Sequence, residues 1–357
     1  MKKILTVIGA RPQFIKASVV SKALQSNNQL NEIIVHTGQH FDENMSNIFF
    51  NELNIPKPNY QLNINGKSHG EMTGEMLAAI EKILLNEKPD ALMVYGDTNS
   101  TLAGALAAAK LHIPVIHIEA GLRSFNMKMP EEINRILTDQ VSKILFCPTS
   151  VAVNNLQAEG FNQKNVLIEI SGDVMQDSAL YFKQFVKKPE IDYLPTNNFI
   201  LATLHRAENT DDIYRLKQII DAINHIHHTI APVILPLHPR TSNILNKEKI
   251  QLNACVIDPI GYLEMIWLLD HCKLVLTDSG GLQKEAFFFH KPCVTMRDQT
   301  EWTELIDNGA NKLAGANTDL IIKSVQVMLN QTIEDPFKIY GGGTASVYIA
   351  DYIAQHI

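Results

Sequence analysis

Residues 273–286 read KLVLTDSGGLQKEA, an apolar run that stops at Asp-Ser-Gly-Gly and continues with helical spacing. Gly280 and Gly281 let the backbone turn sharply and let another group come close to its N–H groups. The first turn of a helix carries unpaired N–H donors and a partial positive charge, so it favours an anionic ligand such as a phosphate. Taken alone, this stretch fits an ordinary strand-to-helix turn equally well. The choice between that turn and an anion-binding site depends on the rest of the chain.

Short, β-branched apolar runs alternate with longer helical patterns along the whole chain. The first half has strand candidates at 2–9, 32–38, 91–97, 114–121, 144–149 and 166–173, and the second half has them at 199–205, 232–238, 254–260, 274–281, 292–298 and 311–315. Continuous apolar strands separated by helices indicate parallel sheets that are covered on both faces. The sequence therefore predicts an α/β protein with two doubly wound domains.

The boundary between these domains is marked by a stretch without periodicity. Residues 180–198 contain two prolines and form the expected linker, which places the first domain at 1–180 and the second at 198–343. Near the end of the chain, Ile349, Ile353 and Ile357 recur at four-residue spacing. This spacing predicts a last amphipathic helix over 344–357 that docks on a domain surface.

Composition excludes several classes of protein. The 357 residues carry a net charge of −7 and no basic block, so a nucleic-acid partner is not expected. Only seven uncharged residues, 4–10, stand between Lys3 and Arg11, which is too few for the core of a signal peptide. No stretch approaches the ~20 apolar residues of a membrane span. The four cysteines are scattered, as free thiols in a reducing cytosol would be. We expect a cytoplasmic protein without membrane contact.

Polar side chains gather where the predicted strands end. The strand ends carry Arg11, Gln39, Asp97, Glu119 and Asp173 in the first half, and His205, His238, Asp278, Ser279 and Arg297 in the second. Ligands of open α/β sheets bind beyond the carboxyl ends of the strands. Each residue alone could be a helix cap or an ion pair, but together they predict a cleft shared by the two domains.

The acidic residues in this set have different alternative explanations. Asp97 could cap the next helix, and Glu131, which follows Pro130, could simply interact with a helix dipole. Glu119 ends a buried strand, where a carboxylate needs an ionic or hydrogen-bonding partner or has a functional role. No fixed ligand spacing is present, so no metal is predicted. His205 and His238 each end an apolar run and precede an arginine within two positions, which favours phosphate contact or proton transfer.

Eight motifs in one order give the chain a specific resemblance. The sequence resembles the non-hydrolysing UDP-N-acetylglucosamine 2-epimerase family through GARPQFIKA, YGDTNSTLAG, HIEAGLRS, MPEEINR, ATLHRAEN, LPLHPRT, TDSGGLQKEA and KPCVTMRDQTE. The resemblance implies the GT-B architecture, in which two Rossmann-like domains face a central cleft and a carboxy-terminal helix returns to the first domain. It also implies a homodimer.

The resemblance assigns roles to individual residues. Ser279, Gly280 and Gly281 would hold the diphosphate of a UDP-sugar, and Glu285 would accept the ribose hydroxyls. The positions that surround the diphosphate and the sugar are matched by Arg11, Lys16 and His238. The family's catalytic acids and histidine are matched by Asp97, Glu119, Glu131 and His205.

The chemistry implied by the resemblance is an elimination followed by a re-addition. The anomeric C–O bond breaks, the carbon 2 proton leaves to give a glycal and UDP, and re-addition from the other face gives the epimer. Carboxylates suit this reaction because they stabilise positive charge at the anomeric carbon and also transfer protons. No cofactor and no metal are implied.

Several positions depart from the common family pattern. The pattern's glutamate is Gln13 here, its second arginine after His-Arg is Ala207, and a substrate-contacting arginine is Trp302. The GQH segment continues with Phe41 instead of arginine, and the Tyr-Gly-Asp-Gly near the end is Tyr340-Gly-Gly-Gly. These changes touch the sugar pocket and the segment that binds an activating second UDP-N-acetylglucosamine in bacterial members.

These departures make the chain similar to a subgroup that epimerises UDP-2,3-diacetamido-2,3-dideoxy-D-glucuronate to its manno form for bacterial surface polysaccharides. Epimerisation of UDP-N-acetylglucosamine to UDP-N-acetylmannosamine is the alternative. A glycosyltransferase shares the GT-B architecture and also stays open, as does a non-catalytic sensor of nucleotide sugars.

Overall fold

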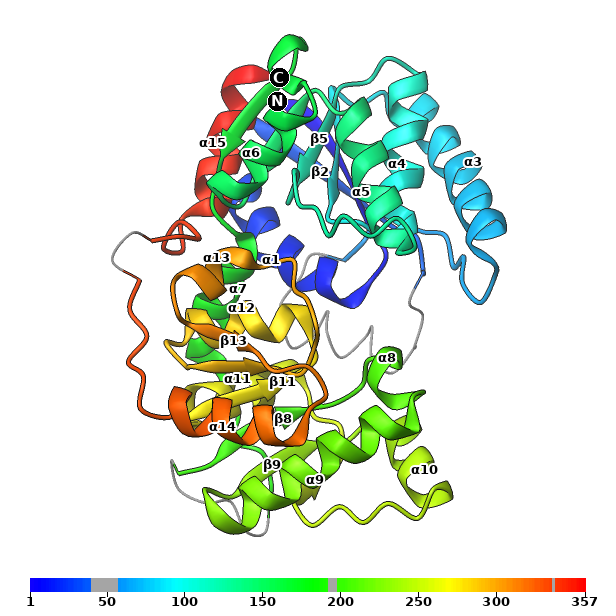
Figure 1. Cartoon of the computed structure of the whole chain (residues 1–357). Helices are drawn as coiled ribbons and strands as arrows, with labels where there is room; N and C mark the ends of the chain where they lie inside the picture. The colour runs from blue at the N-terminus through cyan, green and yellow to red at the C-terminus, as the bar shows by residue number, and fades with distance from the viewer. Residues whose placement is uncertain (40–56, 192–197, 336–337) are drawn as a thin grey trace. The chain divides into compact units, whose positions relative to one another are not determined.

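The computed structural model describes residues 1–39, 57–191, 198–335 and 338–357, with the side chain of Arg11 outside the description. The chain divides into two compact units, Met1–Tyr181 with Lys338–Ile357 (unit 1) and Phe182–Phe337 (unit 2) (Figure 1). Residues 338–343, assigned above to the second domain, therefore belong to unit 1. Residues 182–191, expected in the linker, belong to unit 2.

Unit 1 is built on a seven-stranded parallel sheet. Its strands are β1 (Lys2–Ile8), β2 (Leu30–His36), β3 (Tyr60–Gln61), β4 (Ala91–Tyr95), β5 (Val115–Ile118), β6 (Ile144–Cys147) and β7 (Leu167–Ile170). Their order, β3-β2-β1-β4-β5-β6-β7, reverses direction between β1 and β4. This is the doubly wound arrangement, and its switch point is where ligands of such sheets bind.

The helices of unit 1 connect these strands. They are α1 (Arg11–Ser26), α3 (His69–Glu87), α4 (Asn99–Lys110), α5 (Pro130–Val141), α6 (Ser150–Ala158), α7 (Val174–Phe182) and α15 (Ala345–His356), with a short 3₁₀ turn at Phe161–Gln163. α4 contacts both α3 and α5, and Figure 1 shows the three side by side on one flank of the unit, with α15 on the other. A Cβ at Gly104 of α4 would lie 3.2 Å from Val7 and 3.3 Å from Val94, so the glycine lets α4 sit directly on the sheet.

Unit 2 repeats the plan with six parallel strands. They are β8 (Ile200–Thr203), β9 (Val233–Pro236), β10 (Cys255–Ile257), β11 (Leu274–Thr277), β12 (Cys293–Thr295) and β13 (Asn311–Leu313), in the order β10-β9-β8-β11-β12-β13. The helices are α8 (Ala207–Thr210), α9 (Ile213–Thr229), α10 (Pro239–Lys247), α11 (Tyr262–His271), α12 (Gly280–Phe288), α13 (Thr303–Asp307) and α14 (Thr318–Met328), and Lys183–Phe185 form a 3₁₀ turn.

The core of unit 2 lies between the sheet and the pair α9 and α14. Leu216, Ile220 and Ile223 of α9 and Ile321 and Val325 of α14 are fully buried against the strands. They recur at spacings of three, four and seven residues, which is why one face of each helix is apolar.

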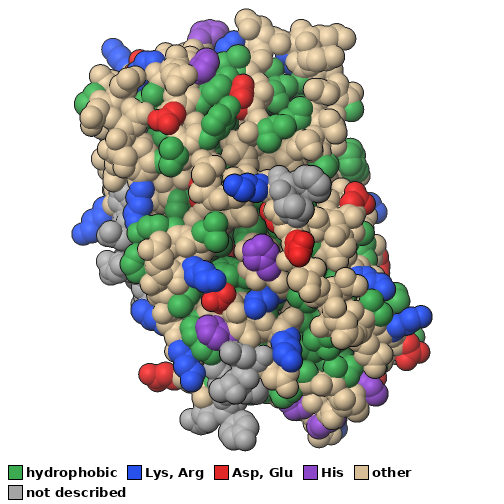
Figure 2. Space-filling view, turned by 90° about the vertical axis from the view of Figure 1, so that its left-hand side faces the viewer, with side chains coloured by type: hydrophobic (Ala, Val, Ile, Leu, Met, Phe, Trp, Pro, Cys, Tyr) green, Lys and Arg blue, Asp and Glu red, His purple; other side chains and the backbone are tan. Residues whose placement is uncertain are grey.

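The strand prediction is confirmed for all twelve predicted runs: eleven contain a whole strand, and the run 32–38 overlaps β2, which begins two residues earlier. Among the strands of the described residues, β3, which has two residues, was not predicted. The predicted terminal helix is α15, which packs on α1 and whose Ala354 carbonyl accepts a hydrogen bond from Lys2 Nζ at 2.8 Å. Within the described parts of the chain, no helix combines the length and the apolar character needed to cross a membrane. On the face drawn in Figure 2, basic and acidic side chains are interspersed with apolar ones.

Candidate functional site

Two turns at the carboxyl edge of the unit 1 sheet have unusual backbone conformations. β4 and β5 are neighbours in the sheet, so the residues that follow them lie at the same edge. Gly96, after β4, has a φ of 61°, and Glu119, after β5, has a φ of 71°. Left-handed backbone is strained for a side chain such as glutamate, and strain of this kind gathers at functional sites. The structure thus singles out Glu119 among the predicted residues.

Glu119 forms an ion pair with Lys16, which comes from α1. Both side chains are about nine-tenths buried, with exposed fractions of 9% and 10%. A Cβ at Gly96 would lie 3.2 Å from Glu119 Oε2 and 3.7 Å from Lys16 Nζ, so the absence of a side chain at Gly96 makes room for the pair. A buried carboxylate is tolerated only when it is paired in this way. Lys16, predicted to contact substrate, therefore also holds Glu119.

Asp97, one residue beyond Gly96, pairs with Arg135 of α5. Arg135 also lies 3.0 Å from Glu132, and Glu132 accepts hydrogen bonds from the backbone nitrogens of Ser124 and Phe125. Burial lowers the pKa of Arg135. The negative charges of Asp97, Glu132 and Glu119 raise it by more, so the net shift of the pKa is upward. Asp97 keeps 30% of its side chain exposed, so it remains accessible to a ligand.

Glu131 has a different position from its neighbour Glu132. Both lie in the first turn of α5, but Glu131 is exposed and Glu132 is 1% exposed. The structure therefore brings Asp97, Glu119 and Lys16 together, and it leaves Glu131 on the surface of unit 1. The side chain of Arg11 lies outside the described residues, and its backbone begins α1.

Gln13, where the family pattern has glutamate, ties two of these turns together. Its side-chain oxygen accepts hydrogen bonds from the backbone nitrogens of Gly9 and Ala10, at 2.8 and 3.0 Å. Its amide nitrogen donates to the carbonyl of Tyr95 at 2.8 Å and to Thr101 Oγ1 at 2.9 Å. An ionised glutamate could not donate these last two bonds, so the substitution fixes the start of α1 to the turn that carries Asp97.

In unit 2, the predicted anion-binding turn is the beginning of α12. Ser279 is the N-cap, and its hydroxyl accepts a hydrogen bond from the backbone nitrogen of Leu282 at 3.5 Å. A Cβ at Gly280 would lie 2.5 Å from Glu301 and 3.7 Å from the Arg206 guanidinium, whereas one at Gly281 would meet no atom within 4 Å. The helix start thus combines backbone donors, a nearby arginine and open space, which suits a phosphate.

Trp302 and Lys284 border the same turn. Trp302, at the position of the family's arginine, is 5% exposed, and its indole nitrogen donates to the carbonyl of Gly280 at 2.9 Å. Lys284 Nζ lies 4.0 Å from the centre of the Trp302 ring, in cation–π geometry. Trp302 therefore stabilises the turn through this hydrogen bond, and it does not supply the positive charge that the family's arginine has at this position. Glu285, predicted to meet the ribose, lies on the second turn of α12 and is 8% exposed.

His205 lies beside a buried carboxylate. Its Nδ1 is 3.2 Å from Asp278, which is fully buried, while 47% of the His205 side chain is exposed. Burial lowers the pKa of His205, the charge of Asp278 raises it, and the charges of Arg206 and His238 lower it, with a net downward shift. His238 caps α10, and its Nδ1 accepts a hydrogen bond from the backbone nitrogen of Arg240 at 3.2 Å. Its Nε2 is therefore the nitrogen that can donate to a ligand.

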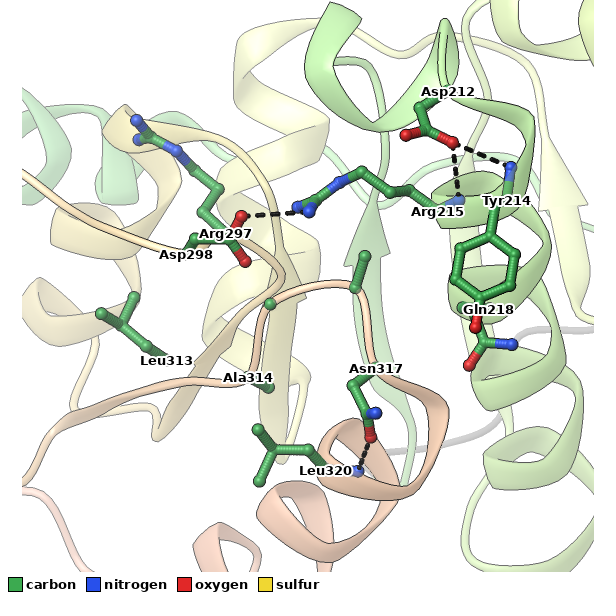
Figure 3. Close-up of a pocket in the computed structure, with 12 residues that line it drawn as sticks. Asp212, Tyr214, Arg215, Gln218, Arg297, Asp298, Leu313, Ala314, Asn317 and Leu320 are labelled. Atoms are coloured by element: carbon green, nitrogen blue, oxygen red, sulfur yellow. Dashed lines mark hydrogen bonds and ion pairs between the residues drawn. The ribbon is translucent and has the colours of Figure 1, made fainter.

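A separate pocket of about 550 Å³ lies in unit 2 between the beginnings of α9 and α14. Figure 3 shows Arg215 reaching across it to Asp298, at 3.0 Å. None of the predicted substrate or catalytic residues lines it. Arg215 Nε also lies 3.2 Å from Asn209 Oδ1, and the Asn209 amide reaches Asp278 at 3.3 Å. The pocket is therefore linked through Asn209 to Asp278, the carboxylate beside His205, and across it Arg215 and Asp298 form an ion pair.

Sequence reasoning missed one residue and one contact. Arg135 stands in the quoted motif MPEEINR without a role, although its spacing of three residues from Glu132 signals a helical ion pair. The support that Asp278 gives to His205 was also missed, because the two residues are far apart in the sequence.

Comparisons with known proteins show the family of the chain. The family model for UDP-N-acetylglucosamine 2-epimerase matches residues 22–354. A UDP-2,3-diacetamido-2,3-dideoxy-D-glucuronate 2-epimerase from Pseudomonas aeruginosa is 65% identical over 99% of both chains.

Solved structures show the same likeness. The UDP-GlcNAc 2-epimerase of Methanocaldococcus jannaschii in complex with UDP-GlcNAc and UDP matches with a TM-score of 0.88 and 43% identity, over 99% of this chain and 100% of that one. The enzyme from Neisseria meningitidis bound to UDP-GlcNAc has a TM-score of 0.88 and 32% identity, over 99% and 100% of the two chains. The predicted GT-B type of α/β fold is confirmed. The chain belongs to the UDP-N-acetylglucosamine 2-epimerase family, and hence to a family of isomerases.

Proposed function

We propose that this protein is a UDP-sugar 2-epimerase that converts UDP-2,3-diacetamido-2,3-dideoxy-D-glucuronate to its manno epimer, in the synthesis of bacterial surface polysaccharide. The observation that carries the substrate is the 65% identity, over nearly the full length of both chains, to an epimerase of that name. The departures at Gln13 and Trp302 support it, because they change the surroundings of the sugar and the diphosphate.

The two units supply different groups. Unit 2 binds UDP: the start of α12 with Ser279, Gly280 and Gly281 meets the diphosphate, and Glu285 meets the ribose. Arg206, which the structure places close to Gly280, adds a positive charge there. Arg11, Lys16 and His238 contact the diphosphate and the sugar. These assignments rest on the geometry of the helix start and on the match to the family's motifs.

The carboxylates of unit 1 carry the proton transfers. As the anomeric C–O bond breaks, UDP leaves with the bonding electrons, and a carboxylate stabilises the positive charge at carbon 1. A carboxylate then accepts the carbon 2 proton, which leaves a glycal. A proton delivered to the opposite face of carbon 2 and the return of UDP to carbon 1 complete the isomerisation.

Asp97 and Glu119 are our candidates for the groups on the two faces. They follow adjacent strands, and each is held by its own cation, Arg135 or Lys16. Glu131 is the third candidate, as the family match suggests. We assign His205 to the leaving diphosphate; burial lowers the pKa of its imidazole, which favours the neutral ring.

The test is a proton NMR experiment in heavy water. The purified protein is incubated with UDP-2,3-diacetamidoglucuronate and, separately, with UDP-N-acetylglucosamine. The proposal expects the carbon 2 proton signal to disappear and a manno signal to grow in the first sample only. Exchange in the second sample only would leave the chemistry in place and make the alternative substrate correct.

Intact sugars in both samples would remove the epimerase function. The next assay would then measure sugar transfer to an acceptor, which is what a glycosyltransferase of the same fold would perform. A variant with Asp97→Asn separates the classes further, because an epimerase loses exchange while UDP binding stays measurable by calorimetry.

We also propose that the protein is a cytoplasmic homodimer. The four cysteines, of which Cys147, Cys272 and Cys293 are buried, are all free thiols, as is usual in a reducing compartment. On α5, Ile133 and Leu137 are 40% and 42% exposed at a spacing of four residues and thus share one face. Such an exposed apolar pair supports a subunit contact. Light scattering on the wild-type protein and on Ile133→Lys with Leu137→Lys measures this: the variant should be monomeric.

A further inference from the structure

His117 of β5 lies between two hydrogen-bond acceptors deep inside unit 1. Its Nε2 is 2.7 Å from the carbonyl oxygen of Gly96, and its Nδ1 is 2.7 Å from Asp139 Oδ1. His117 and Asp139 are both fully buried. A carbonyl oxygen only accepts, so Nε2 has to donate, and a carboxylate oxygen also accepts, so Nδ1 donates too. A ring that donates from both nitrogens is a cation.

The other oxygen of Asp139 shows that the proton belongs to the histidine. Asp139 Oδ2 accepts from Arg123 at 2.8 Å and from the backbone nitrogen of Gly121 at 3.2 Å. Arg123 in turn forms a two-pronged pair with Glu159, at 2.6 and 2.8 Å. Donation from a guanidinium and a backbone N–H favours the ionised carboxylate. The four side chains thus alternate in charge, which is how buried ions are tolerated.

This chain of charges touches both turns that carry the candidate carboxylates. The carbonyl that His117 binds belongs to Gly96, the residue immediately before Asp97. His117 and Gly121, two of the three residues that the Asp139 carboxylate binds, stand two positions before and two positions after Glu119. One aspartate therefore binds the ring of His117 on one side of Glu119 and the backbone nitrogen of Gly121 on the other. The φ of 71° at Glu119 has to be imposed by such surroundings.

We propose that His117, as an imidazolium, and Asp139, as a carboxylate, form a positioning pair that sets the distance and orientation between Asp97 and Glu119. The proposal rests on the epimerase function given above. Neither residue touches the substrate. Their effect is on the reaction step: a shift of the carboxylates by as little as ~1 Å is enough to lower a rate by ~10²-fold.

The first test needs no substrate. Nitrogen NMR of the protein labelled with ¹⁵N-histidine reports whether each ring nitrogen carries a hydrogen. We expect one ring with two N–H nitrogens at pH 8, and we expect its signals to be missing in His117→Gln. A neutral His117 ring at pH 8 overturns the proposal. If His117→Gln does not fold, loss of the same signals in Asp139→Asn assigns them to His117. If neither variant folds, the wild-type protein alone decides: a ring with two N–H nitrogens at pH 8 supports the proposal, and the lack of any such ring overturns it.

The second test separates positioning from general stability. Asp139→Asn is expected to lower kcat by ~10²-fold with KM within about 3-fold, and to release more glycal and UDP per turnover, because the return of the proton depends on alignment. Glu159→Gln is the matched control at the exposed end of the same chain and should keep kcat within about 2-fold. Equal losses in both variants, or a rise in KM alone, would contradict positioning.

Failure of the proposed function and failure of the positioning pair give different results. If the wild-type protein is inert on both UDP-sugars but shows the doubly protonated ring, the function is disproved and the charged pair is confirmed. An active protein with a neutral His117 keeps the function and disproves the pair.

Discussion

Asp278 accepts hydrogen bonds from the backbone nitrogens of both His205, at 3.1 Å, and Arg206, at 2.9 Å, and also lies 3.2 Å from His205 Nδ1. One buried carboxylate thus fixes the backbone and the ring of the histidine. With Nδ1 directed at Asp278, Nε2 is the nitrogen that can meet a ligand. The same aspartate precedes Ser279, so the histidine and the anion-binding turn share one anchor.

Replacing Asp278 by asparagine should lower kcat by ~10²-fold, because a histidine loses its orientation with its carboxylate. It should also change the dependence of activity on pH. The charge of Asp278 raises the pKa of His205, so its removal lowers this pKa further. Protonation of His205 then needs a lower pH, and the acidic limb of the pH profile of kcat should move to lower pH. Asp270→Asn, which changes a carboxylate of α11 that pairs with Lys183, is the control without effect.

The left-handed backbone of Glu119 predicts an order of stability among variants. Glu119→Gly and Glu119→Ala both remove the ion pair, but only glycine adopts a φ of 71° without strain. The free energy of unfolding of Glu119→Gly should therefore be about 1 kcal/mol higher than that of Glu119→Ala. Urea unfolding measures the difference, and neither variant should be active. An alanine variant that is as stable as the glycine variant would show that the turn is unstrained.

Lys16 should matter for stability as well as for substrate. Lys16→Met removes the buried partner of Glu119, and the loss of one member of a buried pair costs on the order of 2 kcal/mol. Lys67, which pairs with Glu71 and Glu75 at the surface, provides the control, and Lys67→Met should leave the urea midpoint unchanged. The opposite ranking of these two variants would mean that Glu119 does not depend on Lys16.

Trp302 should contribute to UDP binding through the turn that it supports. Trp302→Phe keeps most of the buried ring and loses the hydrogen bond to the Gly280 carbonyl. A lost hydrogen bond of this kind weakens binding by ~3- to 10-fold, which calorimetry with UDP would detect. Trp267→Phe, on α11, is the matched control. Unchanged affinity in Trp302→Phe would contradict this supporting role.

The order of strands and helices could be predicted because each strand is a compact apolar run between helical patterns. β3 was missed because a two-residue strand, Tyr60–Gln61, has no pattern of its own. The need of Glu119 for a partner was also predictable, since it closes a buried strand, and the structure supplies Lys16.

Other relationships have no trace in the sequence. Glu131 and Glu132 stand in the same helical turn, and only the rotation of α5 makes one exposed and the other buried. His117 lies inside an apolar strand, and its partner Asp139 is 22 residues away on another element. Such pairs depend on tertiary packing, which neither spacing nor composition reports.

The position of α15 has a consequence for how the chain is made. This helix packs against α1, and its first turn is capped by Asp177, which accepts hydrogen bonds from the backbone nitrogens of Ala345 and Ser346. On the ribosome, α1 emerges before unit 2 and α15 emerges after it, so α1 has to wait for its partner helix. The whole of unit 2 leaves the ribosome in between, as a continuous insertion. Unit 1 is therefore begun before unit 2 and completed after it, so a nascent chain that stops before α15 lacks the cover of α1.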